Sequence, residues 1–143
     1  MIVQRFHIDG YDWDVTAYYA VDGYYVDEIM DNLIEIGCDG ENLRKSHKNL
    51  VRNALNTGLT FSNYETRESV MVVALSSDSK QFHRCLMHEI RHLQSHIATA
   101  DGISEKSEEV CYLLDDIIGL VHDTCSSLIC HCCREKSKKR GGH

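Results

Sequence analysis

Residues 68–97 read ESVMVVALSSDSKQFHRCLMHEIRHLQSHI, and this stretch decides the fold because it joins a buried strand to a long helix. Residues 70–75 are the most continuously apolar run in the chain, which predicts a strand covered on at least one face. Ser77 or Asp78 can cap the helix, and Asp101-Gly102 can end it. Between those ends, apolar residues recur at helical spacing: Phe82, Leu86, Met87, Ile90, Leu93 and Ile97.

The first half of the chain predicts a β-hairpin followed by two helices. The strand segments are rich in alternating, aromatic or β-branched residues and meet at Asp9-Gly10. The helical segments have apolar residues at helical spacing, and Gly37 is placed to end the first of them. The strands are expected at residues 2–8 and 13–21, and the helices at residues 24–36 and 39–55.

The second half repeats this order. A strand at residues 57–64 should pair with a strand at 68–76, and Ser104 can cap a last helix whose apolar stripe runs to Val121. The chain therefore reads β-β-α-α-β-β-α-α, an α+β domain with helices packed on one small sheet. We expect a single domain over residues 1–125, followed by a cysteine-rich and basic tail over residues 126–143.

The composition favours a folded cytoplasmic protein. The 22 acidic and 15 basic residues give a net charge of −7, which opposes nucleic-acid binding, and the basic cluster at 136–140 lies in the tail. No run approaches the roughly 20 apolar residues of a membrane span, and the start of the chain lacks the features of a signal peptide. Seven cysteines, an odd number, fit a reducing compartment. We expect no nucleic-acid or membrane partner.

His88-Glu89-Ile90-Arg91-His92 is an H-E-x-x-H motif within the long predicted helix. Histidines four residues apart project from one helix face, so both imidazoles can bind one Zn²⁺ ion. Glu89 is poorly placed to be a ligand, but it can accept a proton from a metal-bound water. Because a catalytic zinc has three protein ligands and one open position, the motif predicts two metal ligands, a general base and a third ligand elsewhere.

The last helix offers candidates for that ligand. If the chain reverses near Asp101, an antiparallel helix pair brings the start of the last helix level with His92. Glu108, Glu109 and Tyr112 then fall beside the histidines within about one turn. Helical geometry does not decide whether Glu108 or Glu109 is the third ligand. Two acidic residues near a helix N-terminus also stabilise the helix through its dipole, without any metal.

The motif, followed after a short loop by EEVCYL at residues 108–113, resembles the zincin metallopeptidases of the gluzincin type. It looks most like the very small H-E-x-x-H proteins of bacterial and phage genomes, in which a glutamate four residues before a tyrosine lies on the helix after the motif. The resemblance covers residues 57–120 and implies a minimal zincin-like domain. It also implies Glu108 as the third zinc ligand and brings Tyr112 toward the site.

This sequence departs from two related zincin patterns, and these departures limit which subclass it can resemble. The thermolysin-like pattern has an aspartate four residues after its ligand glutamate, where this chain has Tyr112 and Leu113. The metzincin pattern requires a glycine and a third histidine where this chain has Ser95 and Ala98, which excludes that subclass.

The row of histidines on the predicted helix extends to His96. Eight helical residues rise about 12 Å, too far for His88 and His96 to share one ion comfortably, so His96 is expected at the surface or in support of the site. The exposed position is also expected for His83. The zincin resemblance implies that a strand at 57–64 or 68–76 binds extended substrate along its edge.

The cysteine-rich end allows a second, structural zinc site or, alternatively, free thiols or an attachment surface. Its residues lack the paired C-x-x-C spacing of a zinc finger. They are Cys125, Cys130, Cys132 and Cys133, with His122 and His131.

The sequence therefore predicts a zinc-dependent metallopeptidase or related amide hydrolase that acts on a peptide or protein substrate. His88, His92 and Glu108 are the predicted metal ligands, Glu89 the catalytic base, and Tyr112 either a hydrogen-bond donor to the oxyanion or a packing residue. The alternative is a non-catalytic zinc-binding interaction or adaptor protein on the same scaffold. Retention of Glu89 opposes that alternative, because a metal kept only for structure needs no general base.

Overall fold

The structure is a computed structural model that describes residues 1–21, 26–51 and 57–129. Its elements follow the predicted order, and the α+β fold class is confirmed. In chain order they are β1 (Ile2–Ile8), a 3-10 turn (Asp9–Tyr11), β2 (Trp13–Val21), α1 (Val26–Glu35), α2 (Gly40–Val51), β3 (Gly58–Asn63), β4 (Glu68–Ala74), α3 (Ser79–Asp101) and α4 (Glu108–Ile129). Helix α4 thus continues past residue 126, where the sequence predicts the start of a tail.

The four strands form one mixed sheet in the order β1-β2-β4-β3. The neighbours β1 and β2 are antiparallel, as are β3 and β4, whereas the inner strands β2 and β4 run parallel with Thr16 opposite Val70. A parallel pair needs a crossover connection, which the chain makes through α1, α2 and β3. The edge strands of the sheet are therefore β1 and β3.

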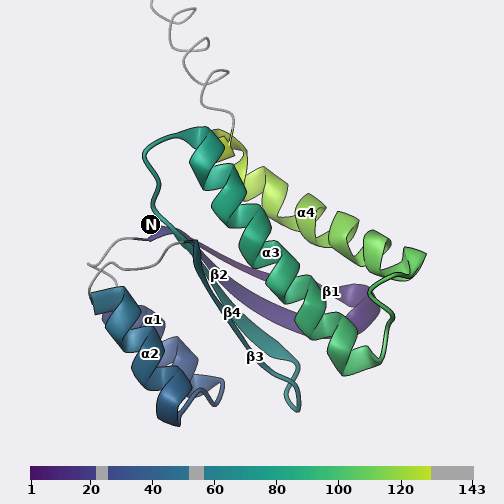
Figure 1. The fold of residues 1–143 in the computed structure, drawn as a ribbon, viewed down its shortest axis with the longest axis horizontal. Helices are drawn as coiled ribbons and strands as arrows, with labels where there is room; N and C mark the ends of the chain where they lie inside the picture. Colours follow the sequence, from purple (N-terminus) through teal and green to yellow (C-terminus); the bar gives the residue numbers. More distant parts are fainter. Residues whose placement is uncertain (22–25, 52–56, 130–143) are drawn as a thin grey trace, which may run out of the picture.

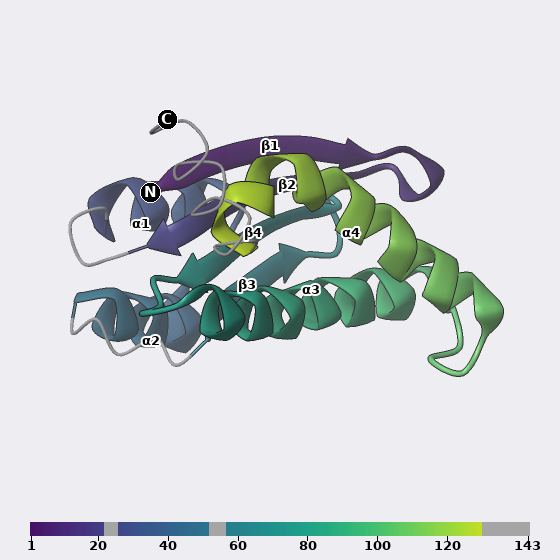
Figure 2. The ribbon, with the colours of Figure 1, turned by 90° about the horizontal axis from the view of Figure 1, so that it is seen from above.

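Helices cover both faces of this sheet. Figures 1 and 2 show α1 and α2 on one face and α3 and α4 on the other. Trp13 and Met71 belong to the core under α3 and α4, whereas Tyr18 and Val72 belong to the core under α1 and α2. The apolar run of β4 is continuous because successive side chains enter different cores. The helices predicted to pack on one sheet are thus divided between its two faces.

The ends of α3 match the sequence prediction, and the start of α4 corrects it. The Asp78 carboxylate accepts a hydrogen bond from the Gln81 amide at 2.7 Å, and Gly102 ends α3 in the left-handed region at φ 66°. At α4, however, the Ser107 hydroxyl accepts from the Val110 amide at 3.2 Å. Ser107 rather than Ser104 is therefore the capping residue, because Ser104 forms the turn just before it and accepts from the Ser107 hydroxyl.

Helices α3 and α4 pack against each other as an antiparallel pair (Figure 2). The Gln94 side-chain amide, itself buried, donates a 2.9 Å hydrogen bond to the backbone carbonyl of Val110. Over the described residues, neither these helices nor the others combine the length and apolar character needed to cross a membrane.

Candidate functional site

His88 and His92 lie one turn apart on the exposed side of α3. Their Nε2 atoms are 3.1 Å apart, and their ring centroids are 4.8 Å apart. Two nitrogen ligands of one tetrahedral zinc ion, each at about 2.1 Å, are separated by about 3.4 Å. The spacing of the pair is therefore compatible with two ligands of a single zinc ion.

Glu89 is buried beside this pair, with only 2% of its surface exposed. Its Oε2 accepts a hydrogen bond from the Thr57 hydroxyl at 2.7 Å, and its Oε1 accepts from the Thr60 hydroxyl at 2.9 Å. Around the axis of α3, the Glu89 side chain differs in direction from that of His92 by about 60° and points toward β3. A carboxylate has about four lone-pair sites, so each oxygen keeps one acceptor site after these bonds.

Gly58 allows β3 to approach Glu89 closely. A Cβ atom at this position would lie 1.8 Å from the Val72 carbonyl oxygen and 3.0 Å from Glu89 Cγ. The backbone φ of 149° is also one that other residues rarely adopt. Gly58, Thr57 and Thr60 are not among the residues predicted from the sequence. The signal that points to the threonines is the need of a buried carboxylate for hydrogen-bond donors.

His96 ends a series of hydrogen bonds that crosses the sheet from β2 through β4 and β3 to α3. The Trp13 indole donates to the Ser69 hydroxyl at 2.8 Å, Ser69 and Ser62 share a 2.6 Å bond, and the Ser62 hydroxyl bonds His96 Nδ1 at 2.7 Å. Burial, and secondly the charge of nearby His92, lower the pKa of His96. This histidine is half-buried and bonds Ser62 of β3, so its role in support of the site stays a prediction, whereas His83 is exposed as predicted.

Glu108 and Tyr112 lie together at the start of α4 and not at the histidine pair. The Tyr112 hydroxyl donates to Glu108 Oε1 at 3.2 Å, and 60% of the tyrosine surface is exposed. Glu109 is exposed as well. Across residues 1–21, 26–51 and 57–129, no three His, Cys, Asp or Glu side chains form a group that could hold a metal ion. The structure therefore brings His88 and His92 together but does not bring Glu108 to them.

The position of α4 around α3 explains this separation. Along the axis, Val110 lies beside Gln94, close to the level expected from the chain reversal. Around the axis, however, Gln94 and His92 differ by about 160° at 100° per residue. Helix α4 packs on the Gln94 side, whereas the histidines lie toward solvent and β3, because neighbouring His96 and Glu89 both bond that strand.

A groove of about 340 Å³ runs along the free edge of β3. The sequence left two candidate strands for binding an extended substrate, at residues 57–64 and 68–76. Of these, β3 lies at the edge of the sheet, whereas β4 is an inner strand. The groove is lined by Asn42, Lys45, Ser46 and Asn49 of α2, by residues 59–62 of β3, and by Tyr64 and His96.

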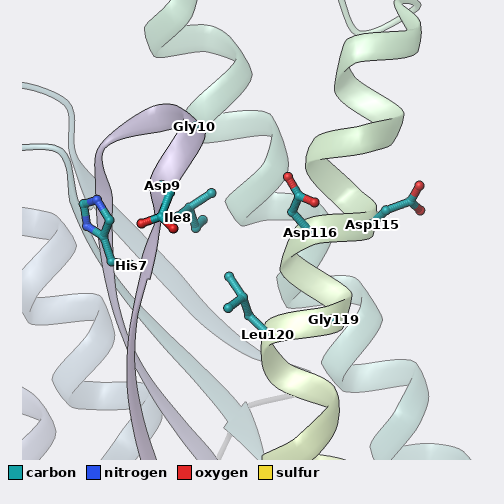
Figure 3. A pocket seen from close by; sticks show the side chains of 8 residues that line it. All are labelled: His7, Ile8, Asp9, Gly10, Asp115, Asp116, Gly119 and Leu120. Carbon is teal, nitrogen blue, oxygen red and sulfur yellow. The ribbon is translucent and has the colours of Figure 1, made fainter.

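A second pocket, of about 410 Å³, lies between the β1–β2 hairpin and α4 (Figure 3). Asp9 lines it from the hairpin, and Asp115 and Asp116 line it from α4. His7, also in its lining, bonds Asp14 at 2.7 Å, and this hydrogen bond raises the pKa of His7. The pocket contains none of the predicted zinc-site residues.

The predicted cysteine-rich site falls mostly outside the described residues. Cys130, His131, Cys132 and Cys133 are not described. Cys125 is a buried thiol, and burial raises its pKa to about 12, while His122 on the same helix is exposed. Among the described cysteines, Cys38 and Cys111 are also free thiols.

Comparison of the chain with known protein families, with characterised proteins and with solved structures finds no match.

Proposed function

We propose that this protein is a zinc-dependent metallopeptidase or related amide hydrolase of the cytoplasm. The observation that supports the proposal best is the convergence of His88 and His92, with Nε2 atoms 3.1 Å apart, next to the oriented carboxylate of Glu89. Metal-binding imidazoles beside a carboxylate base are the groups that hydrolysis by an activated water requires.

Each residue of the site has a distinct part in this proposal. Zinc bound at the histidine pair would lower the pKa of a bound water to about 7 and polarise a carbonyl. Glu89 uses its remaining acceptor sites to take a proton from water and return it to the leaving nitrogen. Thr57 and Thr60 hold that carboxylate in one orientation, so that its position is set before substrate binds.

The free edge of β3 supports a peptide as the substrate. An extended peptide can add to an exposed strand edge through backbone hydrogen bonds. Because Thr60 bonds Glu89 directly, a peptide paired with β3 would pass beside the proposed base. The zincin resemblance implies Glu108 as the third ligand and Tyr112 as the oxyanion donor, but neither lies at the histidine pair. Either role would require the first turn of α4 to move around α3 toward that pair, and in the observed arrangement the two histidines would hold the ion without Glu108.

One observation favours a second candidate function, a non-catalytic zinc-binding adaptor. Both oxygens of Glu89 already accept hydrogen bonds in a buried setting, as they would in a purely structural contact between α3 and β3. In that case the exposed histidines could bind zinc without any need for a base. The two candidates differ in what Glu89 must do.

Replacing Glu89 by glutamine separates them. A hydrolase should lose about 10² to 10⁴ in kcat, since the amide cannot accept the proton. One threonine hydroxyl would lose its acceptor, so the free energy of unfolding should fall by about 1 kcal/mol, while zinc content stays unchanged. The wild type would be incubated with zinc and a peptide library, and new termini would be counted by mass spectrometry.

Thr60→Val is the matched control, because it removes one hydrogen bond to Glu89 and keeps the carboxylate. It should cost a similar amount of stability but lower kcat by less than about tenfold, because the carboxylate that accepts the proton is kept and Thr57 still bonds it. Cleavage that persists undiminished in Glu89→Gln would reject the hydrolase. A wild type that cleaves no peptide, together with zinc-dependent binding of a partner that is unchanged in Glu89→Gln and Thr60→Val, would also reject the hydrolase and would favour the adaptor.

A further inference from the structure

We propose that the polar face of α2 makes the groove along β3 selective for an extended peptide that carries an acidic residue, with Lys45 as the selecting side chain. This inference rests on the proposed function, because it names the substrate class of that same site.

The α2 side of the groove is one continuous helix face. Asn42, Lys45, Ser46 and Asn49 are spaced i, i+3, i+4 and i+7, which places them in one stripe along the helix. Two carboxamides and an ammonium group therefore face the strand edge, together with Ser46, whose hydroxyl donates to the Asn42 carbonyl of the same helix at 2.8 Å and can still accept. These groups can hydrogen-bond a peptide in the groove, whereas an apolar face would favour a buried aliphatic partner.

The opposite side of the groove is the outer edge of β3, where no other described strand pairs with it. The Ala74 amide donates to the Thr57 carbonyl, so Thr57 pairs with β4. Since alternate residues of an antiparallel strand turn their amide and carbonyl groups to opposite edges, Gly58, Thr60 and Ser62 turn theirs to the free edge. An extended peptide is the ligand that satisfies such a row of donors and acceptors.

The charge of the groove selects among extended peptides. Among the described residues that line the groove, Lys45 is the only Lys, Arg, Asp or Glu, in a protein with a net charge of −7. Lys45 forms no ion pair with any other described residue, and its neighbour Arg44 is paired with Glu41. Half-buried His96 of α3 closes the groove on the side away from α2. An acidic side chain in the groove would thus meet one cation that pairs with no described residue and, among the described lining residues, no carboxylate.

The position of the groove fixes where the acidic residue must lie. The groove starts at Leu59 and Thr60, beside Glu89, and reaches Tyr64. Four strand residues span about 13 Å. The acidic residue should therefore fall within about four residues of the bond cleaved at Glu89, and on one side of that bond only.

Binding of synthetic peptides to the full chain tests this inference without relying on cleavage. The probes are fluorescein-labelled, C-amidated octapeptides of Thr, Val and Ser, with glutamate, glutamine or lysine moved through every position, and binding is followed by anisotropy with EDTA present. The wild type should bind the best glutamate peptide two- to fivefold more tightly than its glutamine match, as expected for one exposed charge pair. Lys45→Met should remove this difference, and Lys45→Glu should transfer the preference to lysine peptides.

Lys48→Met is the control, because Lys48 is exposed on the same helix but does not line the groove. It should leave the preference unchanged, and N-methylation of alternate peptide amides should abolish binding by the wild type. Equal affinities for glutamate and glutamine peptides, or a preference that survives Lys45→Met, would overturn the inference. If the zinc-loaded protein cleaves peptides without any preference for glutamate, only the inference fails. If glutamate peptides bind through Lys45 but none is ever cleaved, the proposed hydrolase fails instead.

Discussion

Glu89 is a charged residue on a helix face that is otherwise apolar. Phe82, Leu86 and Leu93 share this face and are buried, and Glu89 is buried with them. A buried carboxylate is costly without hydrogen-bond donors, and the threonines of β3 provide them. The H-E-x-x-H motif predicted a functional glutamate here. Its partners, however, lie about 30 residues earlier in the chain, where the sequence predicted only a strand at residues 57–64.

His96 gives a prediction for the pH dependence of stability. Its pKa is lowered in the folded protein, so below about pH 6.5 the unfolded chain takes up a proton that the folded protein resists. The free energy of unfolding should therefore fall as the pH drops from about 6.5 toward the folded pKa, and this part of the fall should be absent in His96→Gln. Urea unfolding at pH 7.5 and 5.5, with EDTA to remove metal from His92, measures it.

The exposed His83 on the same helix supplies the control, since His83→Gln should keep the full pH dependence of the wild type. A His96→Gln variant that loses as much stability on acidification as the wild type would contradict the role of burial and of the Ser62 contact at this histidine.

At the scale of elements, periodicity identified every strand and helix but not how the helices are rotated against one another. Gly37 and Gly102, both with positive φ, end helices as predicted, because helix ends are encoded locally. The side of α3 on which α4 packs is not encoded locally, because it depends on the whole apolar stripe of both helices. The sequence therefore placed Glu108 correctly along α3 but could not reveal that Gln94, on the side away from His92, makes the contact.

This arrangement predicts the effect of removing Glu108. Because its carboxylate bonds Tyr112 and is not grouped with the histidines, Glu108→Ala should change zinc affinity by less than about twofold. A competition titration with a chromophoric chelator measures the affinity, with Glu109→Ala in parallel as the control. A loss of tenfold or more in Glu108→Ala alone would show that α4 does supply the third ligand, as the zincin resemblance implies.

In the whole molecule, the site lies where the two cores meet at one edge of the sheet. β3 sends Leu59 and Phe61 toward the α1 and α2 core, and Thr60 and Ser62 toward α3. The helix that carries the histidine pair is thereby bonded, through Glu89 and His96, to the strand that lines the groove beside α2. The sequence predicted the parts of this arrangement, but the crossover that makes β2 and β4 parallel, and so leaves β3 at the edge, follows from long-range packing that local patterns do not encode.

Zinc stoichiometry in matched variants tests the central proposal most directly. Native mass spectrometry of protein prepared without chelators should show one zinc ion that is lost in both His88→Ala and His92→Ala, because one histidine alone rarely retains the ion. His83→Ala should keep that ion, and any zinc bound by the cysteine-rich end would persist in all three variants. A wild type that takes up no zinc, or zinc content that is the same in the wild type and in His88→Ala, would contradict a metal site at the histidine pair.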